Sequence, residues 1–157
     1  MQKKCTFACQ INTVLKTMRH LQNKSGILEA AAKLLHREDY YPAVAHSAYY
    51  SCFQLFKHIW LHSLLKTEND LSNELRQYKA TNGDIGSHEF LINQIVLYIK
   101  KTGKKDCSSH ALALNNKIIQ LKRLRQCADY EDSLFDSSKS SHSLSLSADI
   151  IPILKQY

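Results

Sequence analysis

Apolar residues recur every three or four positions within residues 39–65, and this spacing predicts a long amphipathic helix. The stripe consists of Tyr49, Phe53, Phe56, Trp60 and Leu64. Small side chains widen it at Ala45, Ala48 and Cys52, which lets another helix approach closely. Pro42 suits the first turn, because proline lacks the N–H that would be unpaired there. We interpret this helix as the centre of a bundle with its aromatic face in the core; a platform for stacking a ligand is the alternative.

The N-terminal part of the chain carries the same helical spacing. Apolar positions in residues 7–37 alternate steps of four and three, with Ser25 at the one polar step. One long helix fits this pattern. Two helices divided at Ser25-Gly26 fit it as well, because glycine costs about 1 kcal/mol in a helix interior and serine is a good N-cap.

Two more stretches, residues 87–101 and 108–130, each carry one apolar face of a helix. Residues 66–87 are polar and contain two glycines near their end, which predicts a loop with room for a short helix at 71–78. Eight serines fall within residues 133–147. We interpret that segment as a mobile loop or a polar linker before a short closing helix.

Glycine and proline are scarce, with four and two residues, which argues against an all-β protein rich in tight turns. We therefore predict an all-α fold, an antiparallel four- to five-helix up-and-down bundle. Residues 1–25 are expected to form an N-terminal helical extension, and residues 26–157 the bundle itself.

Composition bears on the partners and the cellular compartment of the protein. The net charge of +7 is compatible with RNA or another polyanion as partner. The first ten residues lack the apolar core of a secretory signal, and no stretch is long enough to cross a membrane. The five cysteines form no compact framework, and Cys52 and Cys127 fall inside helical patterns. A reducing, cytoplasmic setting without membrane attachment is expected.

No metal and no cofactor are predicted. His58 and His62 are four residues apart, a spacing that can chelate a transition metal on a helix. However, Ile59 stands where a zinc protease has its glutamate, and no third ligand is indicated. We interpret the two histidines as polar positions beside the apolar stripe.

Basic residues cluster along the later helices. The two groups are Lys100, Lys101, Lys104 and Lys105 at a turn, and Lys117, Lys122, Arg123 and Arg125 on the following helix. Both can contact phosphates without regard to sequence, or can simply form a solvated surface. If the two helices are antiparallel, the groups lie at opposite ends of the long helix and need not form one surface.

A family resemblance rests on three short motifs. Ala48-Tyr49-Tyr50 with Phe53 stands in the central helix, His88 opens the next amphipathic helix, and R-Q-C-A-D-Y occupies residues 125–130. Together with the surrounding helical pattern, which covers roughly residues 27–157, these motifs resemble the HEPN domains of prokaryotes. The motifs are short and largely structural.

The resemblance implies a dimeric helical bundle in a defence or toxin–antitoxin setting, often beside a nucleotidyltransferase-type protein. It also implies metal-independent RNase activity through an Arg-x4–6-His motif. This chain lacks that motif after Arg125. The positions where the histidine would stand are occupied by Tyr130, Glu131 and Asp132. The nearest later histidine is His142, inside the serine-rich segment.

A candidate polar site remains, made of Arg125, Asp129 and Tyr130 with His88. Three aromatic residues, Tyr49, Tyr50 and Phe53, form a candidate packing or dimer face. The leading hypothesis is a dimeric binding or partner module with RNA or a nucleotide as ligand, and an enzyme is the less favoured class. The alternative is an endoribonuclease with an atypical site around Arg125, using Tyr130 or a spatially distant histidine. A third is an interaction domain whose polar corner is only structural.

Overall fold

The computed structural model describes the backbone of residues 3–157 and the side chains from residue 20 onward. This part of the chain is all-α. Its helices are α1 (Lys3–Arg37), α2 (Tyr41–His58), a π-helical turn η1 (Ile59–Ser63), α3 (Glu68–Asn82), α4 (Ser87–Lys101), α5 (Cys107–Tyr130) and α6 (Ser137–Leu154). The described residues therefore form six α-helices, one more than the upper end of the expected range, and they confirm the predicted all-α bundle.

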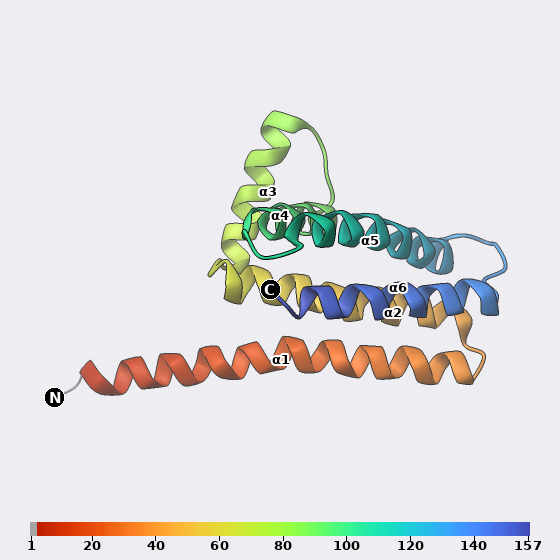
Figure 1. The fold of residues 1–157 in the computed structure, drawn as a ribbon, viewed down its shortest axis with the longest axis horizontal. Coiled ribbons are helices and arrows are strands. Elements are labelled where there is room, and N and C mark those ends of the chain that lie inside the picture. Colours follow the sequence, from red (N-terminus) through yellow and green to blue (C-terminus); the bar gives the residue numbers. More distant parts are fainter. Residues whose placement is uncertain (1–2) are drawn as a thin grey trace.

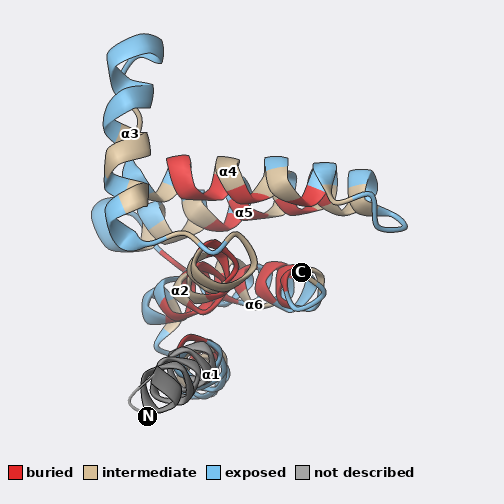
Figure 2. Ribbon diagram, turned by 90° about the vertical axis from the view of Figure 1, so that its left-hand side faces the viewer, coloured by how far each residue is buried: buried red, intermediate tan, exposed pale blue. Residues whose placement is uncertain are grey.

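The helices lie in three layers. Helix α1 forms one outer layer, α2 and α6 lie side by side in the middle, and α4 and α5 form the other outer layer (Figures 1 and 2). Helices joined by short connections run antiparallel, as the pairs α1–α2 and α4–α5 show. Helix α2 contacts α6 beside it and the helices of both outer layers, so it is the centre of the bundle.

The aromatic face of α2 accounts for that central position. Tyr49, Phe56 and, in η1, Trp60 are almost completely buried, and the indole Nε1 of Trp60 donates a hydrogen bond to the Thr67 carbonyl at 2.9 Å. The small residues Ala45 and Ala48 are also fully buried. They leave room for neighbouring helices to approach, and the large aromatics fill the space between the layers.

Helix α1 runs without a break through Ser25-Gly26, so of the two expected arrangements the single long helix is the one observed. Leu21 and Ser25 are both buried against the bundle. The boundary drawn at residue 25 thus falls inside one continuous helix. Gly26 is exposed, and no atom lies within 4 Å of where its Cβ would stand, so glycine is not needed there for space.

The serine-rich segment was interpreted as a loop or linker, and that interpretation was wrong for residues 137–147, which begin α6. Asp136 caps this helix by accepting the Lys139 backbone N–H at 2.9 Å. Ser140 and Ser143 are fully buried, and the Ser143 hydroxyl donates to the Lys139 carbonyl within the same helix. The Ser140 hydroxyl lies 2.8 Å from Nδ1 of His36 in α1, so both buried hydroxyls are hydrogen-bonded, and these small side chains let α6 pack closely on its neighbours.

Helix α3 is longer than the short helix expected in residues 66–87. Thr67 and Asp70 form a reciprocal capping box at its start. None of its residues is buried, and it projects away from the three layers (Figures 1 and 2). Its one aromatic anchor is Tyr78, whose ring meets Phe90 of α4 edge to face, with centroids 5.5 Å apart.

Candidate functional site

The residues predicted to form a polar site lie together in the structure. They meet where the middle of α2, the first turn of α4 and the last turns of α5 converge. Contacts join Tyr49, Tyr50 and Phe53 of α2, His88 of α4, and Arg125, Asp129 and Tyr130 of α5. We call this group the Arg125 corner.

The guanidinium of Arg125 is the centre of the corner. Its Nη2 donates to the hydroxyl of Tyr130 at 3.2 Å and, more weakly, to that of Tyr50 at 3.5 Å. Its Nε lies 2.7 Å from Oδ2 of Asp129, one helical turn away. This contact is an ion pair, and the Nε atom itself is buried.

Tyrosine rings surround this cation. The guanidinium carbon lies 5.9 Å from the ring centroid of Tyr49, 5.6 Å from that of Tyr50 and 5.2 Å from that of Tyr130. Burial opposes the charged form, but Tyr50, Asp129 and Tyr130 outweigh it and raise the pKa of Arg125 above its usual value. Arg125 therefore carries a permanent positive charge in an aromatic setting.

His88 is held between α2 and α4 by ring contacts. Its imidazole stacks on Phe53, and its Nδ1 lies 3.2 Å from the hydroxyl of Tyr49. Burial, followed by the positive charges of Arg125 and Lys122, lowers the pKa of His88. Burial also raises the pKa of Tyr49, so its hydroxyl remains protonated at neutral pH. His88 is therefore a neutral imidazole near pH 7, able to exchange a proton at Nε2.

Sequence reasoning missed His46. Its ring lies against that of Tyr50, with centroids 4.6 Å apart, and its Nδ1 is 3.3 Å from the same Asp129 oxygen that meets Arg125. The signal was present in the spacing, because His46 precedes Tyr49 by three residues and Tyr50 by four. Those separations place all three side chains on one face of a helix.

The aromatic residues of α2 divide between core and site. Tyr49 and Phe53 are buried within the chain, so of their two expected roles, packing is the one that the structure displays. Tyr50 is half-buried and directs its hydroxyl toward Arg125. Tyr130 is 73% exposed, which makes it the outermost part of the corner.

Other residues singled out from the sequence lie elsewhere. His142 is on α6, beside a shallow depression that Arg123 and Cys127 also line. Lys117 pairs with Asp149 and Lys122 with Glu89, so the basic residues of α5 are partly neutralised.

His58 and His62 contact each other with ring centroids 4.8 Å apart, and Gln22 of α1 approaches His58 Nε2 at 3.2 Å. Burial lowers the pKa of both histidines. Among the described residues, no three His, Cys, Asp or Glu side chains gather closely enough to hold a metal ion.

Comparison with known protein families, with curated proteins and with solved structures gave no match to this chain. Across residues 3–157, no helix has both the length and the apolar character needed to cross a membrane.

Proposed function

We propose that this chain is a HEPN-like helical bundle that acts by binding, and that the Arg125 corner holds RNA or a nucleotide. The observation that carries the proposal is the pairing of a permanently charged guanidinium with the exposed ring of Tyr130. Arginine recognises phosphate oxygens through paired N–H groups, and an exposed tyrosine gives a nucleobase a face for stacking. The corner presents both within 5.2 Å.

Fluorescence anisotropy with a labelled single-stranded RNA of about 12 nucleotides tests the proposal, because that length falls within the roughly 4 to 16 nucleotides that OB-fold proteins cover on single strands. Tyr130→Ala should weaken binding by roughly five- to a hundredfold, the range for loss of one stacked base. Arg125→Lys keeps the positive charge but removes the paired N–H donors of the guanidinium. This variant should bind RNA more weakly, and its binding should still depend on salt concentration.

Matched controls come from residues outside the corner, at the turn between α1 and α2. Tyr40→Ala removes a tyrosine that is 63% exposed near the start of α2, and Arg37→Ala removes an exposed arginine at the end of α1. Both variants should bind RNA as the unmodified protein does. Equal losses in Tyr130→Ala and Tyr40→Ala would refute a site at the corner. Competition by AMP and ATP distinguishes a nucleotide ligand from an RNA chain.

A second function, metal-independent RNA cleavage, is favoured by one specific observation. His46 and His88 both contact the ring of Tyr50, whose hydroxyl accepts from Arg125. A neutral His88 can take the proton of a ribose 2′-hydroxyl, and His46 can return one to the leaving 5′-oxygen. Arg125 would stabilise the negative charge that develops on the non-bridging phosphate oxygens. The products would be a 2′,3′-cyclic phosphate and a 5′-hydroxyl.

Cleavage assays in the presence of EDTA separate the two functions. If the protein is this RNase, His46→Gln and His88→Gln should each lower the rate by about 10²- to 10⁴-fold without abolishing binding. Cleavage that survives in Arg125→Ala would exclude the corner as its site. The homodimer and the nucleotidyltransferase-type partner remain predictions of the resemblance, and sedimentation equilibrium of the purified chain tests the first of them.

A further inference from the structure

The outer face of α4 and α5 carries apolar side chains that no other part of the described chain covers. Leu97 of α4 is 48% exposed, and Leu112 and Ile119 of α5 are 64% and 50% exposed. Helix α5 is thus apolar on two sides: Leu114, Ile118 and Leu121 point into the core, and Leu112 and Ile119 point outward. The second stripe does not help to bury this chain's own core.

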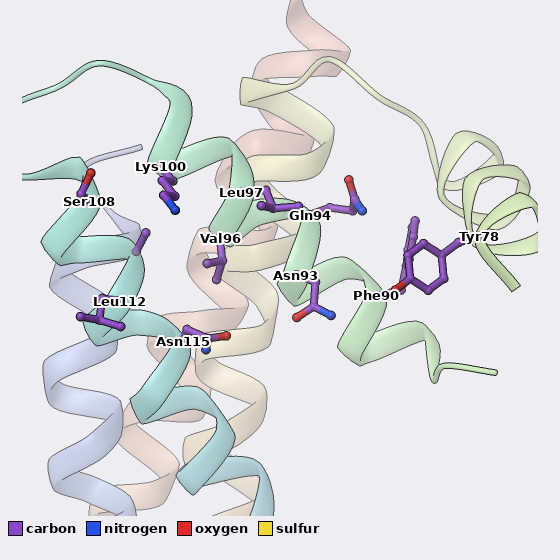
Figure 3. A pocket seen from close by; sticks show the side chains of 11 residues that line it. Tyr78, Phe90, Asn93, Gln94, Val96, Leu97, Lys100, Ser108, Leu112 and Asn115 are labelled. Atoms are coloured by element: carbon purple, nitrogen blue, oxygen red, sulfur yellow. The ribbon is translucent and has the colours of Figure 1, made fainter. Parts of the chain in front are cut away.

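These side chains line one continuous groove between the two helices. Two adjoining depressions, of about 440 and 230 Å³, share Asn93 of α4 and Asn115 of α5. Figure 3 shows the larger one, with Tyr78 and Phe90 at one end and Lys100 and Ser108 at the other. From Ser108 to Arg123 the groove follows α5 for about 22 Å, the length of four helical turns. A channel of this length between antiparallel helices fits the apolar face of a third helix.

Positive charge lies at both ends of the groove. Lys100 stands at the end of α4, and Arg123 stands near the far end of α5. Lys122 is paired with Glu89, whereas neither Lys100 nor Arg123 has an acidic partner within the described residues. Lys101, also exposed, adjoins Lys100.

This charge pattern argues against a second copy of the chain as occupant. If two α5 helices met in antiparallel orientation, Leu112 would face Ile119 of the second copy, and Lys100 would approach its Arg123. In parallel orientation Lys100 would meet Lys100, and Arg123 would meet Arg123. Like charges therefore come together either way, which disfavours self-association through this face.

We propose that the α4–α5 groove binds an amphipathic helix of another protein, with apolar residues at helical spacing and acidic residues near both ends. The apolar side chains would cover Leu97, Leu112 and Ile119. Aspartates or glutamates about 15 residues apart would reach Lys100 and Arg123, because 15 residues of helix span about 22 Å. The surface lies outside the Arg125 corner and does not depend on the function proposed for it.

The test uses a fluorescein-labelled designed peptide of about 18 residues, with leucines every third or fourth position and two glutamates at each end. A twin peptide carries lysine in place of every glutamate. The acidic peptide should bind the full chain at least about tenfold more tightly than its twin, and Leu112→Glu should weaken that binding by about tenfold or more. The double variant Lys100→Glu, Arg123→Glu should reverse the preference between the two peptides.

Leu34→Glu is the matched control, because Leu34 is 51% exposed on α1, in the outer layer on the far side of the bundle. It should bind the acidic peptide as the unmodified chain does, and circular dichroism should show all variants equally helical. Equal binding of the two peptides, or unchanged binding by Leu112→Glu, would overturn the proposal. So would a dimer in sedimentation equilibrium that Leu112→Glu dissociates, since that result would assign the groove to a second copy.

Discussion

The imidazole ring of His88 stacks on the phenyl ring of Phe53, with centroids 3.9 Å apart and planes inclined by 22°. This contact fastens the start of α4 to the middle of α2, and it brings the histidine beside Tyr49 and Arg125. One side chain thus links the packing of the bundle to the electrostatics of its polar corner.

His88 should make the stability of the protein depend on pH. Its pKa is lowered in the folded chain by burial and by nearby positive charge, and it returns to about 6.5 when the chain unfolds. As pH falls below 6.5, the unfolded state gains a proton that the folded state does not yet bind. The free energy of unfolding therefore falls, by at most about 1.4 kcal/mol per pH unit, and levels off below the folded-state pKa.

Urea unfolding at a series of pH values between 7.5 and about 4.5, spanning this transition, measures that slope. His88→Gln should give a flatter profile, and it should cost about 0.5 to 1.5 kcal/mol at pH 7 through loss of the ring stack. His142→Gln, an exposed substitution on α6, should leave the slope unchanged. His58 and His62 also have lowered pKa values, so some pH dependence should remain in His88→Gln.

Arg125→Ala should lower the free energy of unfolding by about 1 to 2 kcal/mol, more than the value of under about 1 kcal/mol expected for an exposed ion pair. The reason is that the side chain is only 16% exposed and interacts with tyrosine rings as well as with Asp129. Thermal unfolding followed by circular dichroism measures the change. A purely structural corner would show this loss while RNA binding by Tyr130→Ala stays intact.

Gly26→Ala should stabilise the protein by about 0.5 to 1 kcal/mol, because alanine favours a helix interior and nothing obstructs its methyl group. Gly83→Ala offers the opposite case. The space there is equally open, but its φ of +93° lies in a region that favours glycine. That variant should be destabilised by about 1 kcal/mol or more. Chemical denaturation measures the free energy of unfolding of both variants. A more stable Gly83→Ala variant would contradict the argument from its backbone conformation.

Cys52 should resist alkylation in the native protein. Its thiol is fully buried, and burial raises its pKa to about 12, so almost no thiolate exists at pH 8. Iodoacetamide treatment followed by peptide mass spectrometry should find Cys52 unmodified in buffer and modified in urea. Cys107 and Cys127, which are partly exposed, should react under both conditions.

Periodic apolar residues predicted much of this fold. Tyr49, Phe56 and Trp60 were placed in the core from their spacing alone, because a helix with so large an aromatic stripe must bury it. The serine-rich start of α6 was not predicted, because its helical character depends on tertiary contacts. Ser140 and Ser143 are fully buried where α6 packs on the bundle, and this packing outweighs their weak helix propensity.

The membership of the Arg125 corner was only partly visible in the sequence. Arg125 and Asp129 were paired by their helical spacing, and the structure places them 2.7 Å apart. Helical spacing places His46 on the same face as Tyr49 and Tyr50, but it does not indicate that this histidine meets Asp129. Its approach to Asp129 joins residues that are 83 positions apart, which no local periodicity can reveal.

The position of α6 has a consequence for the route by which the chain folds. The α1–α2 and α4–α5 hairpins join neighbouring segments, so each can form from local contacts at small entropic cost. Helix α6 instead packs against α2 across a long stretch of intervening chain, and it supplies the buried Ile150 and Leu154. Until it docks, the aromatic side of α2 lacks part of its cover. A chain in which the serine-rich helix has not docked would therefore expose part of its core, and such exposed apolar surface promotes aggregation.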